Sequence, residues 1–157
     1  MNNLDIPGVL KKLSGMAKRF DTLKRYENIS LEDYLLNEDV QIITERLLEL
    51  IIQAAIDINK MFLKQLINIR FVADSGQPLT NAETFRLMGA HAFIPSDLAE
   101  MVARSGQFRN VLAHFYDDIN SRQVYDALQI TLNYYPDYIK AIQDYIDSLF
   151  HDLEVNP

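Results

Sequence analysis

The sequence contains no cysteine and few of the residues that break regular structure. Without cysteine there is no disulfide and no thiolate metal site, a composition that suits a reducing cytoplasm, where we expect the protein to reside. Five glycines and five prolines in 157 residues leave little room for turn-rich β architecture. The three histidines lie far apart in the sequence, so we expect neither a metal ion nor another cofactor.

Long uncharged apolar segments are also absent. No stretch approaches the roughly 18 apolar residues of a membrane-spanning helix, so we expect no membrane partner. The first residues lack a charged start followed by an apolar run, and an export signal is therefore not expected. No glycine-rich phosphate-binding loop is present, which indicates that the chain does not bind and transfer a nucleotide by itself.

Charge is unevenly distributed along this acidic chain, whose net charge is -7. Residues 1–26 contain six lysines and arginines against two aspartates and carry a net charge of +4, which leaves -11 for the remainder. A solvated helix face that balances the acidic remainder is the simplest interpretation. An acidic partner or a phosphate backbone is the alternative use of this basic segment.

Leucine, isoleucine and alanine recur at helical rather than alternating spacing, which predicts an all-α protein. Because no linker or internal repeat divides the chain, we expect residues 1–157 to form one domain, an antiparallel helical bundle of four to five main helices. The expected helices cover residues 6–26, 37–71, 80–89, 96–116 and 120–150. Pro136 must kink or split the last of these, since it lacks an amide donor.

Capping residues and one apolar row support these boundaries. Ser30, Thr80 and Asn120 are the expected N-caps, and Glu83 completes a capping box with Thr80. Within residues 37–71, the expected seam of the bundle follows spacings of four and three residues. Its members are Leu47, Ile51, Ala54, Ile58, Met61 and Gln65.

The segment RNVLAHFY, residues 109–116, contains polar residues that a bundle does not require. On an ideal helix, Arg109 shares a face with Tyr116, and Asn110 shares another face with His114. Arg109 and His114 lie about 140° apart around the axis, so one regular helix does not bring them together. Three features could bring the two side chains together: a loosened helix end, the length of the arginine side chain, or a second copy of the chain.

This segment resembles the Arg-x-x-x-x-His-x-Tyr motif of the HEPN superfamily, and specifically that of HepT toxins. The resemblance extends to ERLLELIIQAAIDI, residues 45–58, which is similar to the family's long second helix. Residues 82–116 are similar to its short helix, proline-opened helix and active-site segment, in the same order. Residues 1–35 and 138–157 match only in helical character. The resemblance implies a HEPN-type helical bundle.

The resemblance also implies an activity, a metal-independent endoribonuclease toxin of a type VII-like toxin–antitoxin pair. The substrate would be RNA, with tRNA as a candidate, and the antitoxin would be an MntA-like nucleotidyltransferase that transfers AMP to Tyr116. Two protomers would place two motifs at one cleft, so a homodimer is expected. The alternative is a different class of function, a non-catalytic nucleotide- or partner-binding subunit of a nucleotidyltransferase. A third interpretation is a structural bundle without a ligand.

The residue types suit this chemistry. Histidine titrates near neutral pH, so His114 is the candidate base, or the acid toward the leaving oxygen. Arg109 remains charged, and its planar guanidinium suits phosphate oxygens. Asn110 would position phosphate or fix His114, unless it simply faces solvent. Asp57 would orient Arg109 or His114, and an ordinary carboxylate paired with a lysine is an equal alternative.

Overall fold

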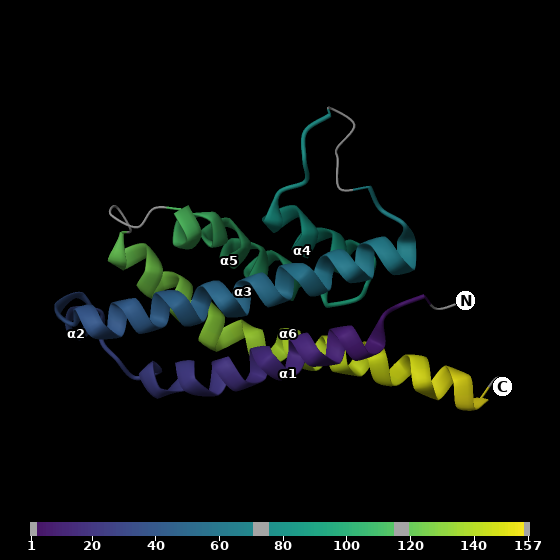
Figure 1. The fold of residues 1–157 in the computed structure, drawn as a ribbon, viewed down its shortest axis with the longest axis horizontal. Coiled ribbons are helices and arrows are strands. Elements are labelled where there is room, and N and C mark those ends of the chain that lie inside the picture. Colours follow the sequence, from purple (N-terminus) through teal and green to yellow (C-terminus); the bar gives the residue numbers. More distant parts are fainter. Residues whose placement is uncertain (1–2, 71–75, 115–119, 156–157) are drawn as a thin grey trace.

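The structure is a computed structural model that describes residues 3–70, 76–114 and 120–155, without the side chains of residues 113–114 and 153–155 (Figure 1). It is all-α, as predicted, and none of the described ranges forms a β-strand. The elements are α1 (Ile6–Leu23), a 3-10 turn (Lys24–Tyr26), α2 (Leu31–Leu36), α3 (Glu38–Ile67), α4 (Asn81–Ala90), α5 (Ser96–His114) and α6 (Ser121–Val155). No helix in the described part is both long and apolar enough to cross a membrane.

Helix α3 is the central element of the bundle. It packs against α1, α4, α5 and α6, and Figure 1 shows it between α1 on one side and the α4–α5 pair on the other. Its buried residues recur at helical spacing, so one face of the helix fills the core. That row consists of Leu48, Ile51, Ile52, Ala55, Ile58 and Phe62. Of the six predicted seam residues only Ile51 and Ile58 are buried, because Leu47, Ala54, Met61 and Gln65 lie at the partly buried edge.

The predicted caps are present at three helix starts. Ser30 Oγ accepts a hydrogen bond from Asp33 N (3.1 Å), and Thr80 forms a reciprocal capping box with Glu83. Asn120 Oδ1 accepts hydrogen bonds from the backbone amides of the first turn of α6. These contacts satisfy amides that a helix start leaves without partners, and this explains why the helices begin where the sequence indicates.

Helices α3 and α6 do not end where the sequence predicts. Helix α3 ends at Ile67 rather than near residue 71, because Asn68 adopts the left-handed conformation (φ 52°) that ends helices and that asparagine tolerates. Helix α6 ends at Val155 rather than near residue 150. Of the two expected effects of Pro136, a kink or a split, the helix does not split, and Figure 1 shows it bending along its length. Since Tyr135 and Tyr138 are both fully buried, packing on each side of the proline holds this helix together.

A buried polar network links three of the helices. The hydroxyl of Tyr138 (α6) lies 2.6 Å from Asn59 Oδ1 (α3) and 3.1 Å from the carbonyl oxygen of Ala55. Asn59 Nδ2 donates to Thr84 Oγ1 (α4) at 3.2 Å, and Thr84 in turn donates to the carbonyl of Asn81. Since every member has a partner, these polar groups fix the relative positions of α3, α4 and α6 at little cost.

Candidate functional site

Helix α5 carries the predicted motif and lies close against α4 and α3. Gly106 allows the approach to α4, because a Cβ at that position would lie 3.1 Å from the backbone nitrogen of Ala82 and 3.1 Å from the ring of Phe85. Leu112, six residues further along the helix, is buried in the core. Arg109 lies between these two positions at the partly buried edge of α5 that faces α3.

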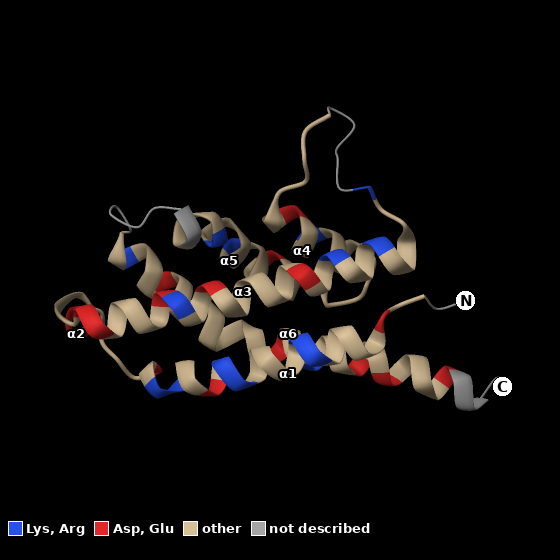
Figure 2. Cartoon of the chain, viewed as in Figure 1, with Lys and Arg blue, Asp and Glu red and all other residues tan. Residues whose placement is uncertain are grey.

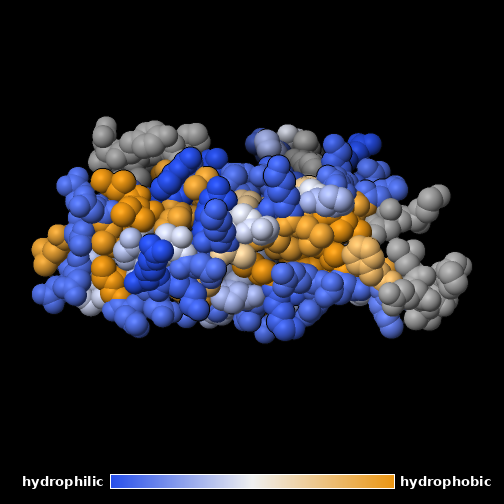
Figure 3. Space-filling model, turned by 60° about the horizontal axis from the view of Figure 1, so that its bottom comes forward, coloured by the Kyte–Doolittle hydropathy of each residue, from blue (hydrophilic) through white to orange (hydrophobic). Residues whose placement is uncertain are grey.

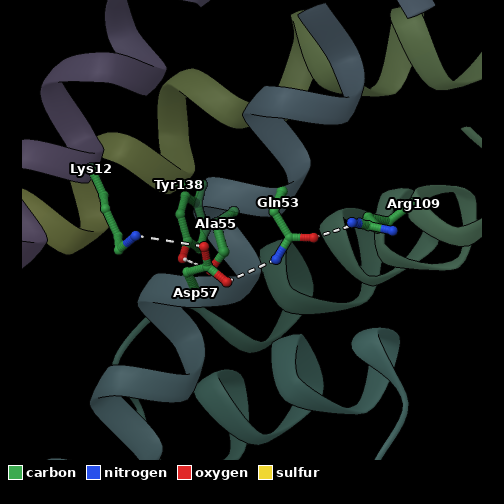
Figure 4. Close-up of polar contacts among 6 residues, drawn as sticks. All are labelled: Lys12, Gln53, Ala55, Asp57, Arg109 and Tyr138. Carbon is green, nitrogen blue, oxygen red and sulfur yellow. Dashed lines mark hydrogen bonds and ion pairs between the residues drawn. The ribbon is translucent and has the colours of Figure 1, made fainter. Parts of the chain in front are cut away.

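A chain of polar contacts runs from Arg109 across α3 to α1 (Figure 4). Arg109 Nε donates a hydrogen bond to Gln53 Oε1, and Gln53 Nε2 donates to Asp57 Oδ1 at 2.8 Å. Asp57 Oδ2 lies 3.5 Å from Lys12 Nζ of α1. Gln53 and Asp57 are four residues apart on α3 and share one face of the helix, which explains their contact.

This arrangement leaves most of the arginine's hydrogen-bonding capacity open. Only Nε of Arg109 is engaged by a side chain in the described parts of the molecule, and its partner is a neutral amide. A carboxylate in the place of Gln53 would form a charge-assisted pair and offset the positive charge. Within the described ranges, Arg109 is thus oriented by α3 without an acidic partner.

Asp57 contacts both Lys12 of α1 and Gln53 of its own helix. It pairs with Lys12, as an ordinary surface carboxylate does, and the two side chains are 39% and 37% exposed, so the pair contributes little stability by itself. It does not contact Arg109, but it holds the amide of Gln53 that does. Sequence reasoning missed Gln53, and its position one helical turn before Asp57 is the signal that would have indicated it.

Asn110 lies on a different side of α5. It is exposed and lines a pocket of about 520 Å³ with Asn81 and Arg86 of α4, whereas Arg109 is directed to α3. Arg86 is engaged by Glu100, with 3.2 Å between Nε and Oε1. The structure therefore does not bring Asn110 to the contact between Arg109 and Gln53.

The other two predicted site residues lie near the end of α5. His114 is the last residue of α5, and its side chain is not among those described. Tyr116 lies outside the described residues, so its role stays a prediction. Because the helix is unbroken from Arg109 to His114, these positions stand about 140° apart around one axis, as an ideal helix requires.

The class of fold is shared with a solved structure. YutE of Bacillus subtilis, described as a cytosolic protein of unknown function, superposes with a TM-score of 0.76 and 15% sequence identity, covering 100% of this chain and 97% of that one. At this identity the likeness establishes the helical architecture. It confirms that the chain adopts a known bundle fold.

Sequence comparison gives the family. Residues 16–142 match the family described as Ribonuclease HepT-like. The chain is also 41% identical over 149 residues to a protein named tRNA nuclease HepT from Aphanizomenon flos-aquae (strain 2012/KM1/D3), covering 95% of this chain and 97% of the relative. The chain therefore belongs to the HepT-like ribonuclease family, which confirms the resemblance seen in the motif.

Proposed function

We propose that this protein is a metal-independent endoribonuclease that cleaves tRNA and acts as the toxin of a type VII-like toxin–antitoxin pair. Family membership supports ribonuclease activity, and the relative named as a tRNA nuclease matches almost the whole chain. The observation that carries the proposal is the Arg109 guanidinium, which a neutral side chain orients and whose terminal nitrogens meet no carboxylate among the described residues. This is the arrangement that phosphate recognition requires.

The proposed reaction is attack of a ribose 2′-oxygen on the adjacent phosphorus. His114 removes the proton of the 2′-hydroxyl, the new O–P bond forms, and the bond from phosphorus to the 5′-oxygen breaks. The leaving 5′-oxygen takes up a proton from water, and the products carry a 2′,3′-cyclic phosphate and a 5′-hydroxyl. Arg109 stabilises the charge on the phosphorane, an effect worth roughly 3 to 4 kcal/mol for a preorganised donor.

We further propose that the active form is a homodimer. Positions 109 and 114 stand about 140° apart around one unbroken helix, so a second copy is the simplest way to bring an arginine and a histidine to one phosphate. Exposed apolar residues at the α2–α3 junction support association. They are Leu35, Leu36, Ile42 and Ile43, and apolar atoms are visible at this left end of the molecule in Figure 3.

The proposed antitoxin is an MntA-like nucleotidyltransferase that transfers AMP to Tyr116. Tyr116 follows Arg109 by seven residues, and positions seven apart share a face when both are helical. The AMP phosphate would compete with RNA phosphate for Arg109, because both are anions that suit the same guanidinium. Modification would therefore switch the nuclease off.

Cleavage of tRNA in the presence of EDTA tests the proposal. The wild type, Arg109→Ala and His114→Ala are compared with Arg104→Ala, which removes an exposed arginine of the same helix. We expect cyclic phosphate ends from the wild type and from Arg104→Ala, and a loss of at least about 100-fold in the other two. If folded, unmodified wild type leaves tRNA intact, the nuclease proposal is wrong and the nucleotidyltransferase-binding subunit becomes the better account.

A further inference from the structure

A groove between α1 and α3 lies directly beside the contact that orients Arg109. Its volume is about 450 Å³, and Gln53 and Asp57 form part of its α3 wall. Gln53 thus has the groove on one side and Arg109 on the other, as Figure 4 shows for the chain of contacts from Lys12 to Arg109. Any polymer held at Arg109 has this groove as an immediate neighbour.

The α1 wall of the groove is basic. Lys11, Lys12 and Arg19 line it, and Figure 2 shows the lysines and arginines spaced along α1. Asp57 is the one acidic residue in the lining, so the lining residues carry a net charge of +2 in a protein whose net charge is -7. An acidic protein binds a polyanion only where positive charge is gathered locally, and the lining of this groove gathers such charge.

The packing of α1 accounts for the position of these residues. Val9, Leu13, Met16 and Phe20 are buried and fix the rotation of the helix. The adjoining flank then faces α3, and it contains two glycines as well as the basic residues. A Cβ on Gly15 would lie 3.0 Å from Arg19 Nη1, so the absent side chain leaves room for the Arg19 guanidinium to fold back along the groove.

Two of the three basic side chains have no anionic partner in the described part of the chain. Asp57 is engaged by Lys12, with 3.5 Å between the charged atoms, whereas no carboxylate pairs with Lys11 or Arg19. Both of these residues are exposed. Their charges are therefore free to meet an external anion without first breaking an internal ion pair.

We infer that the α1–α3 groove binds backbone phosphates of the RNA next to the phosphate held at Arg109. This inference rests on the proposed nuclease function and extends it, because it assigns the basic first helix to substrate binding. Lys11 and Arg19 contact phosphate oxygens, and Lys12 with Asp57 links the groove to Gln53. Such contacts are independent of base sequence, so they contribute affinity and register, and selection among RNAs has another origin.

Binding of end-labelled tRNA, measured by fluorescence anisotropy over a range of salt concentrations, tests this. All proteins carry His114→Ala, so that the RNA stays intact and binding is measured apart from cleavage. The test variant is Lys11→Glu/Arg19→Glu. The matched control is Lys18→Glu/Arg25→Glu, which makes the same change in net charge at exposed positions nearby that do not line the groove.

We expect the test variant to bind about tenfold more weakly at physiological salt and to show a shallower salt dependence, by the loss of about two phosphate contacts. The control should stay within about threefold of its parent, since it changes only the long-range field. Equal losses in the two variants, or no loss in either, would overturn the inference. So would a change in the molar mass of the test variant by light scattering, which would identify the groove as a contact between copies.

The outcome is separable from that of the nuclease proposal. If wild-type protein fails to cleave tRNA but the groove variant alone loses binding, the groove is a phosphate site on a binding subunit. If wild type cleaves and the groove variant binds normally, the nuclease proposal stands and the groove assignment is wrong.

Discussion

Gln53 and Arg109 join α3 to α5 through a hydrogen bond in which the amide oxygen accepts from Nε of the guanidinium. The other end of the amide donates to Asp57, so the amide has one favoured orientation. Reversing it would turn its NH2 group toward a cation and its oxygen toward a carboxylate. The contact therefore holds the arginine in place without neutralising it.

Replacing this amide by a carboxylate should harm the nuclease more than removing it. In Gln53→Glu, the new carboxylate would pair with Arg109 and compete with the RNA phosphate. We expect kcat/KM for tRNA cleavage to fall by roughly 100-fold, against about tenfold for Gln53→Ala, which only loosens the arginine. The measurement is initial cleavage rate at low substrate concentration. A carboxylate variant more active than the alanine variant would contradict this account of the neutral partner.

The buried network around Asn59 should show coupling in stability. Asn59→Leu removes the nearest acceptor of the Tyr138 hydroxyl, and we expect a loss of about 2 kcal/mol in the free energy of unfolding. Tyr138→Phe should cost about 1 kcal/mol. The double variant should cost less than the sum, because each single change leaves a polar partner behind. Urea denaturation measures all three, and strict additivity would show that the two groups act independently.

Two glycines in helices should respond to alanine in opposite directions. At Gly89, a Cβ would lie 2.6 Å from Ala99 Cβ, and we expect Gly89→Ala to lower the free energy of unfolding by about 1 to 3 kcal/mol through overpacking. The better helix propensity of alanine, worth at most about 1 kcal/mol, does not offset this. At Gly15 only the mobile end of Arg19 is near, so Gly15→Ala should stabilise by about 0.5 to 1 kcal/mol. Thermal unfolding compares the two.

Alkaline pH should destabilise the bundle through its buried tyrosines. Burial raises the pKa of Tyr135 and of Tyr138 above the ordinary value near 10. The folded state therefore favours the protonated phenol. The contribution of each phenol to the free energy of unfolding is fully present below a pH of about 10. Above that pH it falls by up to about 1.4 kcal/mol per pH unit for each such group.

Tyr135→Phe isolates one of these groups. Ser105 Oγ donates to the carbonyl of Val102, so it keeps a partner when the tyrosine hydroxyl is removed. The variant should lose about 1 kcal/mol at neutral pH and show a shallower decline above pH of about 10. Urea unfolding at a series of alkaline pH values gives both quantities. An unchanged slope would mean that Tyr135 does not ionise on unfolding in this range.

The elements that could be predicted from sequence are those with local causes. Ser30 and Thr80 begin helices because their own side chains satisfy nearby amides, and this is visible within four residues of sequence. The seam of α3 was placed less well, because Leu47 and Leu48 are both apolar and only the neighbouring helices decide which is buried. The end at Asn68 depends on a left-handed backbone that asparagine permits but does not require.

In the candidate site too, local features could be predicted from sequence and contacts between distant residues could not. Arg109 is predicted as a site residue because its spacing to His114 resembles a family motif, which is a local pattern. Its partner Gln53 is 56 residues away, and the contact depends on how α3 packs beside α5. Asp57 was expected to act on Arg109 or His114, and the contact that the structure shows runs to Gln53, a side chain that spacing alone does not reveal.

The contact between Gln53 and Arg109 depends on the axial position of α3 relative to α5. Glu49, Gln53 and Asp57 follow one another at intervals of one helical turn, and only the middle residue is uncharged. Each outer carboxylate already has a cation, Arg46 for Glu49 and Lys12 for Asp57. If α3 slid along α5 by one turn, about 5.4 Å, in either direction, Arg109 would meet an acid and lose its free charge. The axial register of two helices thus determines whether this arginine can attract an anion.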